Sequence, residues 1–170
     1  MNRIRTLGVL LFGLALLSAC GYNLVGRGTF LPKEIKTISI PIFQNTTPEP
    51  NLENDVSNQI RQKFITDGRL KVVEDSGQLL LTGKIISYNL QPVAYDANNN
   101  VSEYLILMDF HVVLTNRAKN EQMLDQTFNT KWHYKVSTEI TDSESQRRDA
   151  IREASIDAAE RMVSLVIEGF

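Results

Sequence analysis

The sequence predicts an α+β fold in two layers, a mixed sheet of four to five strands with two helices packed on one face. Three observations support this prediction. Two stretches carry apolar residues at helical spacing, one before and one after a central region. In that central region apolar and polar residues alternate over long extended stretches, as in strands with one buried face. The order strand, helix, strands, helix lets one sheet bury both helical stripes.

The first strand is expected over residues 35–43, where alternation places Ile38, Ile40 and Ile42 on one face. Pro41 falls inside this stretch. Because proline has no backbone N–H to donate, the strand should lie at an edge of the sheet or turn that position outward.

A helix is expected next, over residues 51–67. Its apolar residues recur at steps of four, and Gly68 just beyond them is a typical stop signal. A short strand over residues 69–74 follows. Because a helix separates the two strands, we expect them to pair in parallel.

Three longer extended segments come next, over residues 79–95, 103–115 and 123–136. The middle segment alternates without a break, with these side chains on one face: Tyr104, Ile106, Met108, Phe110, Val112 and Leu114. Asparagine-rich turns at 96–100 and 116–120 predict two antiparallel hairpins. If the second hairpin turns near Ala118, His111 lies close to Asp125 and His133 lies close to Glu103, as charge-balancing pairs on a sheet surface.

The last element is a helix. The stretch Ser143-Glu144-Ser145-Gln146 resembles a capping box and is expected to open a helix that runs to about residue 168. Its apolar stripe consists of Ile151, Ala154, Ala158, Met162 and Leu165.

The first 19 residues are typical of a secretory signal peptide. Arg3 and Arg5 precede an apolar run of 11 residues, which is too short to span a bilayer as a helix. The junction Leu17-Ser18-Ala19-Cys20 resembles the bacterial lipobox. That resemblance implies cleavage before Cys20, a diacylglycerol on its sulfur, and an acyl chain such as palmitate on the new amino terminus. The alternative is that Cys20 is a buried small hydrophobic residue or a chance one.

The predicted organisation is a lipoprotein signal peptide at 1–19, a lipid-anchored, glycine-rich tether at 20–34, and one α+β domain at 35–170. Gly21 follows the cysteine in place of aspartate. By the enterobacterial sorting rule this resembles an outer-membrane destination, with the domain on the periplasmic side.

Composition argues against several classes of function. Without Arg3 and Arg5, 16 of the 18 basic residues remain against 20 acidic ones, so nucleic acid is not an expected partner. We expect no enzyme, because no nucleophile lies at a useful spacing from a base and no phosphate loop or GxSxG motif is present. With two histidines and an acylated cysteine, neither a metal site nor any other cofactor is expected.

Seven stretches carry a further signal: CGYNLVG at 20–26, LP at 31–32, IKTISIPIFQNTT at 35–47, LE at 52–53, DGRL at 67–70, YD at 95–96 and VSEY at 101–104. Together they resemble the LptE-like family of lipopolysaccharide-assembly lipoproteins of Gram-negative bacteria. The resemblance implies an outer-membrane lipoprotein that plugs the β-barrel LptD, helps this barrel assemble, and binds lipopolysaccharide.

One turn departs from the family pattern. Some relatives carry basic residues in the turn before the VSEY-like stretch, whereas residues 96–100 here contain no cation. Arg117 and Lys119, at the opposite hairpin end, are therefore the candidate contacts to lipopolysaccharide phosphates.

Two other functions are alternatives to the plug. One is a periplasm-facing lipoprotein that itself carries or binds lipid, which requires an apolar cavity beyond the core. The other is a periplasmic hydrolase, for which the sequence shows no catalytic spacing.

Overall fold

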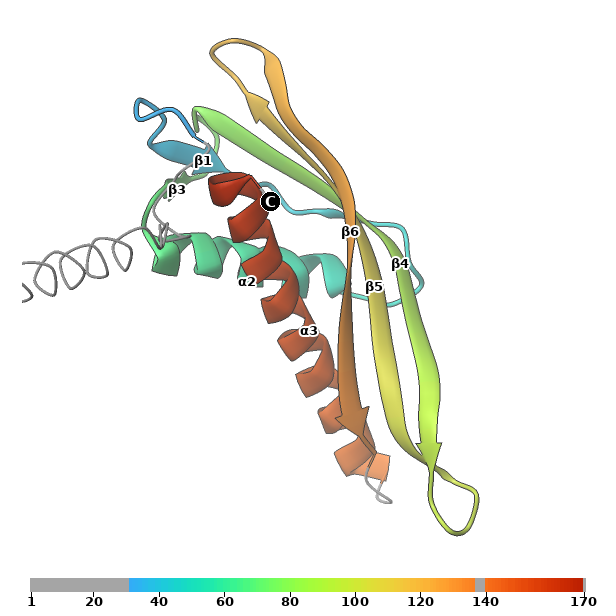
Figure 1. The fold of residues 1–170 in the computed structure, drawn as a ribbon. Coiled ribbons are helices and arrows are strands. Elements are labelled where there is room, and N and C mark those ends of the chain that lie inside the picture. Colours follow the sequence, from blue (N-terminus) through green and yellow to red (C-terminus); the bar gives the residue numbers. More distant parts are fainter. Residues whose placement is uncertain (1–30, 137–139, 170) are drawn as a thin grey trace, which may run out of the picture.

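The computed structural model describes residues 31–136 and 140–169 (Figure 1). Its elements, in chain order, are β1 Thr37–Ser39, β2 Gln44–Asn45, α2 Leu52–Asp67, β3 Lys71–Val73, β4 Leu79–Tyr95, β5 Val101–Asn116, β6 Glu121–Lys135 and α3 Ile140–Glu168. The predicted signal peptide at 1–19, Cys20 and most of the predicted tether lie outside the described residues. Neither α2 nor α3 has the combination of length and apolar composition needed to cross a membrane.

The strands form one sheet in the order β3-β1-β4-β5-β6, and β2 also pairs with β4. β1 runs parallel to β3 and to β4, whereas β4–β5 and β5–β6 are antiparallel hairpins. Figure 1 shows α2 and α3 on the same side of this sheet. The α+β prediction, the parallel first pairing and the two hairpins are therefore confirmed. The sheet has six strands because the 35–45 region contributes two short ones.

The helix α2 forms where the spacing predicted it. Leu52, Val56, Ile60 and Phe64 are all fully buried. Gly68 ends the helix in the left-handed region, at φ 73°, and its N–H donates to the Phe64 carbonyl at 3.1 Å. Glycine adopts this conformation without the steric cost that a side chain imposes, so it terminates the helix here.

The core lies between the two helices and the inward face of β4, β5 and β6. Phe110 of β5 is fully buried and stacks on Phe128 of β6, with ring centroids 5.2 Å apart. The facing stripe of α3 includes Ala154 and Ala158, also fully buried, whose small side chains allow close approach to the bulky sheet residues. The unbroken alternation of β5 thus gives one fully packed face.

The strand predicted over 35–43 is too long, and the prediction is wrong for its last residues. β1 ends at Ser39, and the side chain of Ile42 is 56% exposed, while Phe43 is buried. β1 lies between β3 and β4 and is not an edge strand; Pro41 follows its end. The physical reason is that Phe43 reaches the core, which forces its neighbour Ile42 outward.

The start predicted for the last helix is also wrong. α3 begins at Ile140, so Ser143 lies inside the helix and does not cap it. Glu144 pairs with Arg147 one turn later, with Arg147 Nη2 and Glu144 Oε1 2.7 Å apart. This pair stabilises the first half of a helix that has already begun. The residue pattern of a capping box can therefore also occur inside a helix.

Candidate functional site

One face of the long strands is not covered by a helix. The helices pack on the opposite face, as Figure 1 shows, and the outward positions of β4, β5 and β6 carry mostly polar side chains. We call this surface the free sheet face. Its members on β5 and β6 are Glu103, Leu105, Leu107, Asp109, His111, Val113, Asp125, Thr127, Asn129, Lys131, His133 and Lys135. A polar partner surface suits such a face better than an apolar one.

Cross-strand pairs organise the charges of the free sheet face. His111 Nε2 lies 2.8 Å from Asp125 Oδ1, and His133 Nδ1 lies 2.9 Å from Glu103 Oε1. Both pairs were predicted from the sequence and are confirmed. All four side chains are partly exposed, so the pairs contribute little to stability and can exchange partners when another surface approaches.

These pairs do not form a catalytic or metal arrangement. Across residues 31–136 and 140–169, no three or more His, Cys, Asp and Glu side chains are grouped to hold a metal ion. Each histidine instead faces a single carboxylate at a diagonal position of the neighbouring strand. Chemically, the free sheet face offers hydrogen-bond donors and acceptors for a partner.

A shallow groove of about 400 Å³ opens on the free sheet face beside β2. The apolar Pro41 and Ile42 and the polar Lys84 and His111 are among its lining residues. Gly83 of β4 makes this arrangement possible, because a Cβ at that position would overlap the ring of Phe43.

The outer half of β4 is an apolar edge that the sequence did not reveal. Beyond the two residues paired with β2, this strand has no neighbour on that side within the described chain. Four of the exposed large apolar side chains lie along it: Ile86, Leu90, Val93 and Tyr95. A bulge between Ile85 and Ser87 shifts the alternation, which is why the pattern of the sequence did not show this strip.

The candidate cations Arg117 and Lys119 lie in the turn between β5 and β6. The Arg117 backbone N–H donates to the Gln78 carbonyl at 2.9 Å, and its guanidinium donates to the Asp75 carbonyl. Lys119 is exposed. The two residues therefore lie beside the 74–78 loop, at the end of the sheet where β1 and β3 begin, and not near the 96–100 turn.

The 96–100 turn closes the opposite end of the sheet. Asp96 Oδ1 accepts hydrogen bonds from the backbone N–H groups of Asn98 and Asn100, both at 2.8 Å, and Asn99 adopts a φ of 64°. The bonds from Asn100 hold the pKa of Asp96 below its usual range. The predicted turn is confirmed, and its only charge is the anionic Asp96.

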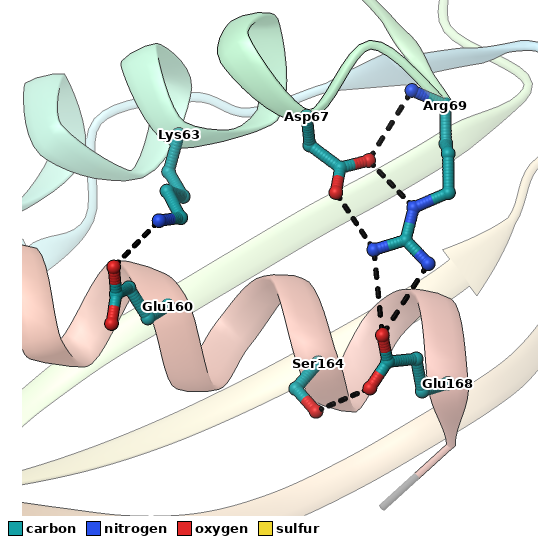
Figure 2. Close-up of polar contacts among 6 residues, drawn as sticks. All are labelled: Lys63, Asp67, Arg69, Glu160, Ser164 and Glu168. Atoms are coloured by element: carbon teal, nitrogen blue, oxygen red, sulfur yellow. Dashed lines mark hydrogen bonds and ion pairs between the residues drawn. The ribbon is translucent and has the colours of Figure 1, made fainter. Parts of the chain in front are cut away.

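Partly exposed ion pairs connect the α2 region to α3. Figure 2 shows Lys63 of α2 paired with Glu160 of α3 at 2.6 Å, and Arg69 held between Asp67 and Glu168. The hydrogen bond from Arg69 holds the pKa of Asp67 below its usual range. The contacts Lys63–Glu160 and Arg69–Glu168 join residues 97 and 99 positions apart in sequence, so they connect the α2 region to α3.

A second polar cluster ties the start of α3 to the loop before α2. Arg147 Nη1 lies 2.6 Å from Glu49 Oε1, and the same guanidinium binds Glu144, which raises the pKa of Arg147. Burial raises the pKa of Tyr88 and takes that of nearby Tyr134 to about 12. The cleft of about 510 Å³ beside Arg147 is lined by the four acids Glu49, Asp55, Glu144 and Asp149 and by the three arginines Arg147, Arg148 and Arg152, so most of its charge is compensated.

Comparisons with known proteins are consistent with this geometry. The family model described as LptE, lipopolysaccharide-assembly, matches residues 35–166. A search of curated proteins finds no match.

Solved bacterial structures share the fold at low sequence identity. Rare lipoprotein B from Shewanella oneidensis superposes with a TM-score of 0.55 at 12% identity, covering 76% of this chain and 92% of that chain. A minor lipoprotein from Acinetobacter baumannii gives 0.52 at 13% identity, covering 79% and 92%. A protein from Xanthomonas campestris gives 0.59 at 11% identity, covering 79% and 85%.

Proposed function

Because the chain belongs to the LptE family of lipopolysaccharide-assembly proteins, we propose that it is an outer-membrane lipoprotein, anchored through Cys20, that plugs an LptD-like β-barrel and helps it assemble. Its role is then to help place lipopolysaccharide in the outer leaflet. It acts by binding and not by catalysis, and the domain at 35–170 works on the periplasmic side.

The free sheet face is the observation that supports the plug. The lumen of a large outer-membrane barrel is polar, so a protein inside it needs a polar exterior. Three adjacent long strands present such a surface, and the helices leave it accessible. The apolar strip on the outer half of β4 offers a second contact region, since exposed apolar residues grouped in this way mark interaction sites.

The first test is affinity purification of the tagged full-length protein from its own membranes. We expect a large outer-membrane β-barrel in about equal amount. Recovery of the lipoprotein alone, or with lipid only, would contradict the plug and favour a protein that itself carries lipid.

A pair of variants tests which surface meets the barrel. Lys131→Glu with Lys135→Glu reverses two exposed charges on the free sheet face and should reduce the recovered barrel. Arg148→Glu with Arg152→Glu makes the same charge change on exposed positions of α3 and serves as the matched control. Equal recovery with both variants would show that the free sheet face is not the contact.

Lipopolysaccharide binding is tested at the β5–β6 turn. We propose that Arg117 and Lys119 contact its phosphates, because both side chains are exposed and neither forms an ion pair within the described part of the chain. Arg117→Gln with Lys119→Gln should lower the lipopolysaccharide that co-purifies. Unchanged lipopolysaccharide with normal barrel recovery would contradict this role for the turn.

A further inference from the structure

A small cleft lies at the end of the molecule where β1 and β3 begin. Its volume is about 200 Å³, and it is lined by Leu31, Pro32, Lys33, Ile35, Lys36, Arg69, Leu70 and Ile167. The apolar residues form its floor, and Leu31, Ile35 and Leu70 are each less than one-tenth exposed. The rim is cationic. An apolar floor with a positive rim fits a ligand that joins a phosphate to an acyl or glycerol group.

Three exposed lysines lie at this end of the molecule. Lys33 and Lys36 line the cleft. Lys71 pairs with Thr37 in the register and so lies on the other face of the sheet, although its backbone N–H donates to the Lys36 carbonyl at 2.8 Å. Within the described residues, none of these three side chains forms an ion pair. Their ammonium groups are therefore available to an external anion.

The carboxylates nearby do not cancel these charges. Asp67 and Glu168 both turn to Arg69, with Asp67 Oδ2 at 2.7 Å and Glu168 Oε1 at 3.4 Å from its guanidinium, as Figure 2 shows. Their charge is thus partly offset by Arg69. The exposed Glu34, next to Lys33 in the chain, is a further acid near the cleft and offsets part of the charge of the lysines.

The predicted anchor lies within reach of this end. Eleven peptide steps separate Cys20 from Leu31, and a chain spans at most about 3.6 Å per residue, or about 40 Å in all. Figure 1 places β1, β3 and the last turn of α2 at one end of the molecule, away from the β4–β5 turn. Because Leu31 lines the cleft, the cleft is the part of the described domain that follows the predicted anchor most directly along the chain.

We propose that Lys33 and Lys36 at the cleft, together with Lys71 on the other face of the same end of the sheet, bind the phosphates of phospholipids in the leaflet that holds the lipid anchor. This proposal rests on the anchor in the proposed function. A lysine near an anionic membrane surface strengthens binding about fivefold. Replacing all three should weaken the docking equilibrium of this end on the bilayer by roughly a hundredfold.

The test uses purified full-length lipoprotein reconstituted in vesicles. Cys20 is the only cysteine of the chain, so a thiol introduced by Pro32→Cys at the cleft can carry a single fluorophore. The readout is quenching by a lipid-attached quencher, in phosphatidylcholine vesicles with and without phosphatidylglycerol. We expect strong quenching with phosphatidylglycerol. Quenching should be weaker at an ionic strength of about 1 M, because the Debye length is then only about 3 Å.

Two controls define the effect. The same label on Asn98→Cys, in the opposite turn, should show little quenching in either vesicle. Lys33→Gln, Lys36→Gln and Lys71→Gln together should abolish most quenching at position 32. Arg148→Gln, Arg152→Gln and Arg161→Gln remove as many positive charges from α3 and should leave the quenching unchanged.

Several results would overturn the proposal. Quenching that stays the same when the three lysines are replaced would do so. Quenching that appears only when a barrel or lipopolysaccharide is added would also do so. If inorganic phosphate abolishes the quenching at position 32, the cleft binds a free anion and not the bilayer. The anchor is checked separately: labelling of the parent protein at Cys20, or failure of the parent to float with vesicles, would contradict the proposed function and not the lysine contact.

Discussion

Replacing Gly83 with alanine tests the contact that shapes the groove on the free sheet face. A Cβ at this position would overlap the Phe43 ring. The ring has little freedom to move, since Phe43 is buried and its backbone N–H donates to the buried Ser57 Oγ at 2.9 Å. Ser57 in turn donates to the Glu53 carbonyl at 2.6 Å, so the contact is held from α2.

Two opposing terms set the magnitude. Overpacking a filled core costs about 1–3 kcal/mol. Alanine in a strand is more favourable than glycine by about 0.5–1 kcal/mol, because glycine loses more conformational freedom on folding. Overpacking wins, so Gly83→Ala should lower the free energy of unfolding by roughly 0.5–2 kcal/mol. For a domain of this size that shift lowers Tm by about 1–8 °C.

The assay is urea unfolding of the full-length protein in detergent, followed by the fluorescence of Trp132, the only tryptophan. Thr82→Ala, at the exposed neighbouring position, should change stability by less than about 0.5 kcal/mol and is the matched control. In a Phe43→Leu background the clash is relieved, and Gly83→Ala should then become neutral or stabilising.

A change of sign between the two backgrounds is the decisive result. If Gly83→Ala stabilises the parent protein, or if its effect is the same in both backgrounds, then the Phe43 contact does not explain the glycine. The orientation of Ile42 would then need another cause. The same variant should also reduce barrel recovery, because a displaced Phe43 moves its neighbour Ile42 and alters the groove.

Three further predictions concern stability and titration. Phe110→Ala should cost about 3–5 kcal/mol in urea unfolding, because this fully buried ring also stacks on Phe128; a cost below 1 kcal/mol would contradict its central place. Asp67→Asn should cost at most about 1 kcal/mol near neutral pH, since the contact to Arg69 is partly exposed. A carboxyl with a lowered pKa stabilises the fold above its ordinary value of 3.8, so this cost should shrink as acid unfolding is followed below that pH; a cost that does not vary with pH would refute the ion pair. Tyr134 should ionise near pH 12 in an ultraviolet titration, so the folded state loses stability between pH 10 and 12, and Tyr134→Phe should remove that loss; ionisation near pH 10 would contradict its burial.

The parts of the fold that alternation and turn chemistry determine could be predicted from the sequence. β5 alternates without interruption, and asparagine-rich turns bound it on both sides, so its buried face and its two antiparallel partners followed directly. The position of the second turn also set the diagonal pairs His111–Asp125 and His133–Glu103. This prediction depends on the β5–β6 register, because a slip of one residue would move both histidines to the other face of the sheet.

The parts that depend on tertiary packing could not be predicted. Ile38, Ile40 and Ile42 alternate equally well, and only the insertion of Phe43 beside Gly83 decides that Ile42 points to solvent. The bulge at Ile86 is likewise invisible in the sequence, because an extra residue is defined only against its partner strand. The ion pair of Arg147 with Glu49 joins residues 98 positions apart, so no local pattern in the sequence indicates it.

The two exposed regions of the sheet imply different modes of recognition. On the free sheet face, two cross-strand pairs satisfy part of the charge and Lys131 and Lys135 are exposed, so this face can meet water before assembly and a polar wall afterwards. The outer half of β4 is an unpaired edge with apolar side chains, which is normally an aggregation hazard. Pro92 and two register shifts near it interrupt the row of backbone groups, so another strand cannot readily add there. Recognition at this part of the edge therefore relies on the side chains Leu90, Val93 and Tyr95, and a partner that covers them needs an apolar surface.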